Sequence, residues 1–135
     1  MGKYKQLYSA VYGVFASTLW TEQNIPTYPM NFNIPSGVFE YIRVDVVSGS
    51  PNNAAFPMSV AGQLIIDIFT SAGQGIERAR DIADILDAYL AGKVLKASKG
   101  SVQLQESVMT LTGIDKNNPS LHRAKYTIPF NYYGV

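Results

Sequence analysis

The chain has 135 residues, of which 47% are hydrophobic and 16% are charged, so we predict a single domain over residues 1–135. It has no cysteine, which excludes disulfides and thiolate metal sites, and no apolar run approaches the roughly 20 residues of a membrane span. The net charge of +1 gives no support for nucleic-acid binding through bulk electrostatics. A charged fraction below the roughly 25% usual for soluble domains favours a permanently assembled subunit, although a monomer with a Ser/Asn/Gln-rich surface would also fit.

The N-terminal part of the chain predicts a helix followed by an extended connection. Apolar and aromatic residues recur every three or four positions over residues 3–19, which places them on one core-facing stripe of a helix. Prolines at positions 26, 29 and 35 exclude a regular helix or a central strand within residues 20–36. We therefore predict an extended connection that carries aromatic side chains.

Two strands that pair as an antiparallel hairpin are predicted next. Residues 38–47 and 59–69 alternate apolar with polar positions, the pattern of half-buried strands. The glycine, prolines and asparagine pair between them, in residues 48–58, are typical of a long hairpin tip rather than a tight turn.

This hairpin tip is a candidate contact with another chain. Hairpin tips project from a sheet, so we expect Asn52, Asn53 and Phe56 to reach a neighbouring subunit or a partner protein. A purely passive connection is the alternative.

The second half of the chain repeats the order of helix and hairpin. Apolar residues at helical spacing predict a helix over residues 76–90, followed by a short edge strand at 94–97. Residues 101–112 and 121–132 alternate again and predict a second hairpin. The expected fold is α+β: a mainly antiparallel sheet of two hairpins packed against two helices, in the order α-β-β-α-β-β.

The glycine-containing junction at residues 71–75 joins a strand to a helix, where a phosphate loop could stand. A phosphate loop requires a lysine followed by Ser or Thr, but Ile76 and Glu77 follow here. A turn with Glu77 complementing the positive end of the helix dipole is the better interpretation. The sole histidine, His122, has no neighbouring pattern typical of a nucleophile.

Acidic residues recur every three positions along the second helix, at Asp81, Asp84 and Asp87. Such spacing can form a site for a hard cation, but Arg78 and Arg80 on the same helix favour a solvated, partly paired face. We therefore predict no catalytic residue, no cofactor site and no metal site, and we expect that the protein is not an enzyme.

Aromatic residues in the C-terminal segment are candidate contacts with a neighbouring chain. Tyr132 and Tyr133 lie in the terminal sequence NYYGV, and aromatic side chains in terminal segments often anchor a chain to a partner's surface. Packing within the subunit is an equally good interpretation.

The order of several segments resembles the tail terminator, or tail completion, proteins of long-tailed bacteriophages. The segments that carry the resemblance are NIPTYPMNFNIPSG, YIRVDV, GQLIIDIFTSAGQG and ERARDIADILDAYL, which together cover most of residues 1–92. The resemblance implies a structural virion protein at the neck of the tail, assembled in the host cytoplasm. It further implies a ring, usually a hexamer, that caps the tail tube, stops tube polymerisation and joins the tail to the head connector.

The partners implied by the resemblance are the tail tube protein and a head-tail connector or neck protein, and DNA would pass through the ring without sequence-specific contacts. Two other functions fit the sequence. One is another head-tail connector or tube-associated protein, and the other is a non-viral α+β module that binds a ligand.

Overall fold

The periodic segments of the sequence form helices and strands in the computed structural model, which describes residues 2–29, 32–49 and 59–134. The helices are α1 (Lys3–Ala16), α2 (Thr18–Thr21) and α3 (Gly75–Leu90), and the short 3-10 helix η2 (Ala72–Gln74) leads into α3. The strands are β1 (Thr27–Pro29), β2 (Tyr41–Ser48), β3 (Ser59–Ser71), β4 (Val94–Lys96), β5 (Ser101–Leu104), β6 (Val108–Ile114) and β7 (Leu121–Tyr133).

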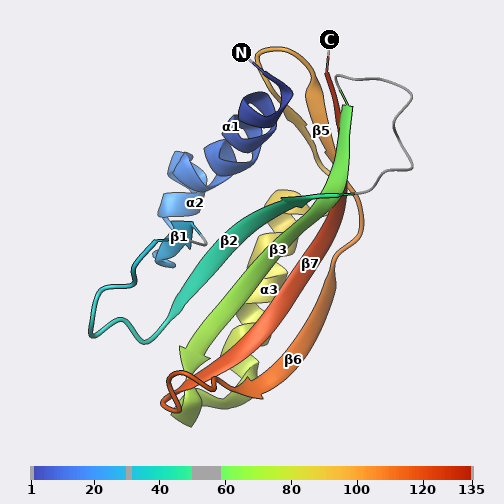
Figure 1. Ribbon diagram of the computed structural model, residues 1–135. Helices are drawn as coiled ribbons and strands as arrows, with labels where there is room; N and C mark the ends of the chain where they lie inside the picture. Colours follow the sequence, from blue (N-terminus) through green and yellow to red (C-terminus); the bar gives the residue numbers. More distant parts are fainter. Residues whose placement is uncertain (1, 30–31, 50–58, 135) are drawn as a thin grey trace.

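The seven strands of the described ranges belong to one curled, mixed sheet (Figure 1) in the order β1-β2-β3-β7-β5-β4, and β6 also pairs with β7. β1 runs parallel to β2, whereas every other pair is antiparallel. The longest ladder joins β3 to β7, from Ser59 opposite Tyr133 to Ser71 opposite Leu121. This ladder forms the middle of the sheet.

The α+β class, the mainly antiparallel sheet, the pairing of β2 with β3 and the helix at α3 are confirmed, but the description as two hairpins against two helices is incomplete. The described ranges form three helices and a mixed sheet of seven strands, in which β3 joins the two predicted hairpins by pairing with β7. The proline-containing connection also contributes a strand, β1, since three residues at the sheet edge lose little from a missing N–H.

Two predicted elements are broken in the structure. The helix expected over residues 3–19 stops at Ser17, whose hydroxyl oxygen accepts a hydrogen bond from the Trp20 amide at 3.4 Å and so caps α2. The strand expected over residues 101–112 divides into β5 and β6. Pro129 explains that break, because its carbonyl accepts from the Gln105 amide at 3.0 Å but the residue has no N–H to donate in return.

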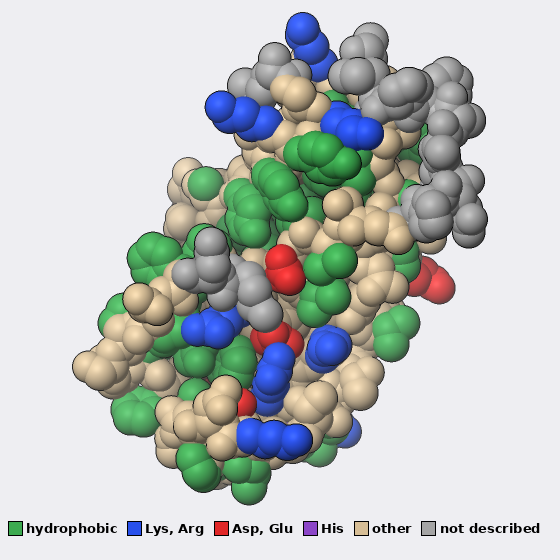
Figure 2. Space-filling view, in the orientation of Figure 1, with side chains coloured by type: hydrophobic (Ala, Val, Ile, Leu, Met, Phe, Trp, Pro, Cys, Tyr) green, Lys and Arg blue, Asp and Glu red, His purple; other side chains and the backbone are tan. Residues whose placement is uncertain are grey.

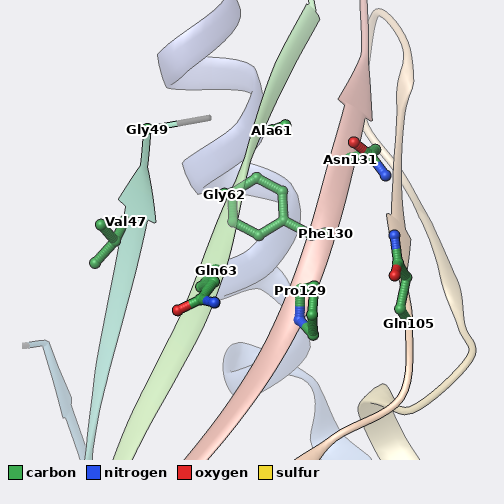
Figure 3. A pocket seen from close by; sticks show the side chains of 9 residues that line it. All are labelled: Val47, Gly49, Ala61, Gly62, Gln63, Gln105, Pro129, Phe130 and Asn131. Carbon is green, nitrogen blue, oxygen red and sulfur yellow. The ribbon is translucent and has the colours of Figure 1, made fainter. Parts of the chain in front are cut away.

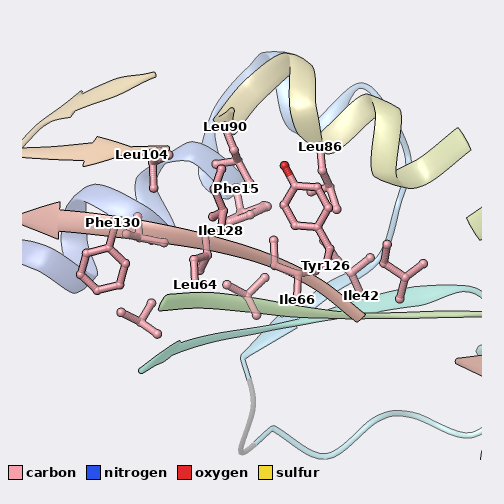
Figure 4. Close-up of a cluster of buried hydrophobic side chains, with 14 of the residues drawn as sticks. Phe15, Ile42, Leu64, Ile66, Leu86, Leu90, Leu104, Tyr126, Ile128 and Phe130 are labelled. Atoms are coloured by element: carbon pink, nitrogen blue, oxygen red, sulfur yellow. The ribbon is translucent and has the colours of Figure 1, made fainter. Parts of the chain in front are cut away.

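The hydrophobic core lies between one face of the sheet and the helices α1 and α3. Figure 4 shows Leu86 and Leu90 of α3, together with Phe15 of α1, packed over Tyr126 and the adjoining apolar side chains of the strands. The predicted apolar stripe of the second helix is thus confirmed as core. None of the helices in the described ranges is long and apolar enough to cross a membrane.

Candidate functional site

The face of the sheet opposite α1 and α3 is the candidate functional site, and we call it the helix-free face. Alternate residues of β2, β3 and β7 lie on it, among them Arg43 beside Asp67, and Asp67 opposite Lys125. Because α3 lies behind β3 and β7 in the orientation of Figure 1, Figure 2 shows this face directly. Basic and acidic side chains gather there over the strands, although the chain as a whole carries few charges.

An ion pair between a buried carboxylate and a partly exposed guanidinium links β3 to β7 on the helix-free face. Asp67 is only 2% exposed, and its carboxylate lies 3.0 Å from the Arg123 guanidinium. The same guanidinium lies 5.6 Å from the centre of the Phe69 ring, within the range of a cation–π contact. A buried carboxylate without a cation would be strongly destabilising, so Arg123 is required for Asp67 to occupy this position.

Aromatic rings border this ion pair. Tyr41 stacks on Phe69 with 4.6 Å between ring centres, and Tyr28 meets Tyr41 edge-on at 6.0 Å. Burial raises the pKa of Tyr41 above its ordinary value, so this ring is neutral at physiological pH. Arg43 lies beside the rings, and its guanidinium donates a long hydrogen bond of 3.5 Å to the Phe32 carbonyl. Aromatic residues and arginine together are typical of the central part of protein interfaces.

Two hollows lie on this side of the sheet. The first, of about 300 Å³, adjoins the ion pair and is lined by Ile34, Tyr41, Arg43, Asp67, Phe69, Asp115, Asn117, Asn118 and Arg123. The second, of about 450 Å³, is uncharged, and Figure 3 shows the amide side chains of Gln63, Gln105 and Asn131 around it. The backbones of β2 and β3 approach each other closely beside this hollow: a Cβ added to Gly62 would lie 2.0 Å from the Val47 carbonyl oxygen.

The two C-terminal tyrosines point to opposite faces of the sheet. Tyr132 is 1% exposed and its hydroxyl donates to the Lys99 carbonyl, whereas Tyr133 is 50% exposed. Alternation along β7 explains the difference. The predicted contacts with a partner stay predictions: within the isolated subunit only Tyr133 is at the surface, and the loop residues Asn52, Asn53 and Phe56 lie outside the described ranges.

The three aspartates of α3 do not form one site. Asp81 and Asp84 are exposed, whereas Asp87 accepts hydrogen bonds of 2.6 Å from the hydroxyl groups of both Tyr126 and Ser107. Burial, and then the bond to Asp87, raise the pKa of Tyr126. Across the described ranges, no three acidic or histidine residues come close enough to hold a metal ion.

One of the two α3 arginines pairs along the helix as expected, and the other pairs with a different element. Arg78 forms two hydrogen bonds, of 2.6 and 3.0 Å, with the Glu40 carboxylate just before β2. Arg80 lies 3.8 Å from Glu77, and both side chains are mostly exposed. The solvated, partly paired outer face predicted for this helix is therefore reduced to Glu77, Arg80, Asp81 and Asp84.

Sequence reasoning missed the cluster of Arg43, Asp67 and Arg123. Each is a charged residue at an alternate position of a predicted strand, on the side opposite the apolar positions. That signal assigns them to a common face of the sheet. It does not show that β3 pairs with β7, which is what brings Asp67 and Arg123 together.

Comparison with known proteins decides the family. Residues 6–131 match the sequence profile of the phage tail terminator protein family. The chain belongs to this family. Tail terminators are structural components of the virion tail and not enzymes, and membership implies contact between this terminator and the tail tube.

Solved structures support the same fold. A chain in the virion of a native gene transfer agent particle superposes with a TM-score of 0.66 at 20% sequence identity, over 96% of each chain. A second solved chain superposes on the terminator with a TM-score of 0.69 at 16% identity, over 97% of this chain and 96% of that one. No curated protein is significantly similar in sequence.

Proposed function

We propose that this terminator assembles into a hexameric ring that caps the tail tube, stops tube polymerisation and joins the tail to the head connector. The observation that carries the proposal is the family match over residues 6–131. The helix-free face supports it, since arginine and aromatic side chains form a surface suited to contact with another protein.

The distribution of exposed apolar side chains also favours a ring. Leu19, 66% exposed, lies at α2 on one side of the sheet, while Val108 and Ile114, 63% and 62% exposed, lie on β6 at the other (Figure 1). A closed ring is built from contacts in which each copy uses two different surfaces. A twofold dimer would instead bury one surface against itself.

The first experiment measures the mass of the assembly. Native mass spectrometry and light scattering on the purified chain should show a hexamer, and electron micrographs should show a ring at the upper end of purified tails. A monomer at tens of micromolar in solution, with no ring on virions, would refute ring formation.

The second experiment separates the two roles at the end of the tube. Tails assembled without the terminator should be overlong or uncapped and should fail to join heads, and supplying the chain in trans should restore both properties. If tails without the terminator have normal length but no heads, the role in ending polymerisation is wrong and the role in joining stands.

A further inference from the structure

We propose that the subunits of this ring contact each other face to back, with the acidic outer side of α3 in one copy docked on the helix-free face of the next copy. In this contact Asp84 and Asp81 pair with Lys125 and Arg43 of the neighbour. The inference rests on the proposed ring and assigns the surfaces that hold it together.

The helix-free face carries cations that lack a carboxylate partner. Arg123 is paired with Asp67 at 3.0 Å. Among the described residues Arg43 and Lys125 form no ion pair: Arg43 reaches only the Phe32 carbonyl, and Lys125 is exposed. Asp45 is the other carboxylate on these strand positions, and Asp115 lines the adjoining hollow. Arg43 and Lys125 are therefore the cations of this face that remain available to pair with an acidic occupant.

The outer side of α3 has the complementary charge. Glu77, Asp81 and Asp84 follow one another at steps of four and three residues, so they share one stripe of the helix. Arg80 lies 3.8 Å from Glu77, and Arg78, although paired with Glu40, also interacts electrostatically with Asp81. Asp81 and Asp84 are exposed and form no ion pair within the described part of the chain.

The two surfaces lie on opposite sides of the subunit. Ile82 and Leu86 of α3 are fully buried against the sheet, so the stripe of Asp81 and Asp84 points away from it. The helix-free face points in the reverse direction (Figure 2). A contact between them uses a different surface from each copy, and contacts of this kind generate a ring when each copy is rotated by the closing angle relative to its neighbour.

Apolar and charged groups would contribute differently to this contact. On the helix-free face, Ile65 is half-buried and Val108 is 63% exposed. On the outer side of α3, Ala88 follows Asp84 by four residues, and its small side chain permits the helix to approach the neighbour's sheet closely. Burying these groups contributes to affinity, whereas the charge pairs fix which residues meet and reject a wrong orientation. Ring stability should therefore fall as salt concentration rises.

The test exchanges the charges across the contact. Asp84→Lys changes an exposed side chain and should leave the melting temperature of the subunit unchanged. Lys125→Glu places a carboxylate opposite the buried Asp67 and should lower the melting temperature, so assembly is compared well below the unfolding transition of every variant. Each single variant should raise the protein concentration needed for half-assembly by about tenfold or more at low salt, because like charges then face each other. The double variant Lys125→Glu/Asp84→Lys restores the pair in reverse and should recover most of the lost assembly.

The matched controls are Lys96→Glu on β4 and Glu22→Lys after α2, which reverse exposed charges outside both surfaces. Both should assemble like the wild type. Arg43→Glu with Asp81→Lys repeats the exchange at the second pair. Assembly is followed by native mass spectrometry in solution and by counting capped tails where rings form only on tubes.

Three outcomes overturn the inference. Rings that are unaffected by both single reversals would refute this contact and leave the proposed ring intact. Single variants that weaken assembly without rescue in the double variant would refute the pairing of Asp84 with Lys125. A wild type that is monomeric both in solution and on tails would overturn the contact and the proposed ring together.

Discussion

Removing the hydroxyl group of Tyr126 should destabilise the subunit through the loss of a single hydrogen bond. Tyr126 is fully buried, and its hydroxyl donates to a carboxylate oxygen of Asp87 at 2.6 Å. A hydrogen bond to a charged group contributes about 1.5 to 3 kcal/mol. Asp87 is exposed and keeps its bond from Ser107, so water can replace the lost donor. Tyr126→Phe should therefore lower the free energy of unfolding by an amount near the lower end of this range, about 1.5 to 2 kcal/mol.

The expected change in melting temperature follows from the length of the chain. An unfolding entropy of about 2.1 cal/mol/K per residue over 135 residues gives roughly 0.28 kcal/mol/K, so Tyr126→Phe should lower Tm by about 5 to 7 °C. Scanning calorimetry measures the change, with the oligomeric state matched between samples by light scattering. Tyr133→Phe in the same strand is the control, and its exposed hydroxyl should contribute within about 0.5 kcal/mol.

A double-mutant cycle provides the result that would refute this reasoning. The cycle combines Tyr126→Phe with Asp87→Ala, and the two changes should be less than additive because they remove the same bond. Strictly additive effects on the free energy of unfolding, or a Tyr126→Phe variant as stable as the wild type, would show that the bond between the hydroxyl and the carboxylate does not stabilise the subunit.

Three further predictions concern the core, the backbone and the pH dependence. Leu86→Ala removes a fully buried side chain and should cost about 2 to 5 kcal/mol, or roughly 7 to 18 °C in Tm; a smaller loss in calorimetry would contradict its place in the core. Gly100→Ala should cost about 2 kcal/mol or more in urea unfolding, because φ is +110° and a Cβ would lie 2.2 Å from the Tyr133 carbonyl oxygen. Gly13→Ala, in an open position of α1, should stabilise by about 0.5 to 1 kcal/mol, and equal effects of both alanines would refute the steric argument. The pKa of Tyr126 is raised in the folded state, so the folded state binds this proton more tightly than the unfolded state does. The resulting contribution to the free energy of unfolding is complete below pH 10, the ordinary pKa of tyrosine, and is lost as pH rises from there through the higher pKa of the folded state. Urea titrations at alkaline pH should therefore show a shallower fall for Tyr126→Phe than for the wild type.

The sequence by itself determined most of the local elements and the family. Apolar residues recur at every second position in residues 59–69 and at every third or fourth position in residues 76–90. These periods indicate a strand and a helix whatever surrounds them. The ordered segments before position 92 were enough for the resemblance to tail terminators, which the family match over residues 6–131 confirms. Pro129 also lies in the printed sequence, yet its effect depends on the strands that flank it.

Only the tertiary structure decided which strands that are distant in the sequence are neighbours in the sheet. Alternation shows that Asp67 and Arg123 lie on polar faces of their strands, but it does not show that these strands pair or in which register. The same limit applies to Asp87, which the helical pattern places on the wet side and which accepts a bond from the buried Tyr126. The physical reason is that a side-chain period is a property of a few consecutive residues, whereas strand pairing joins positions 56 residues apart such as these two, through the packing of the whole chain.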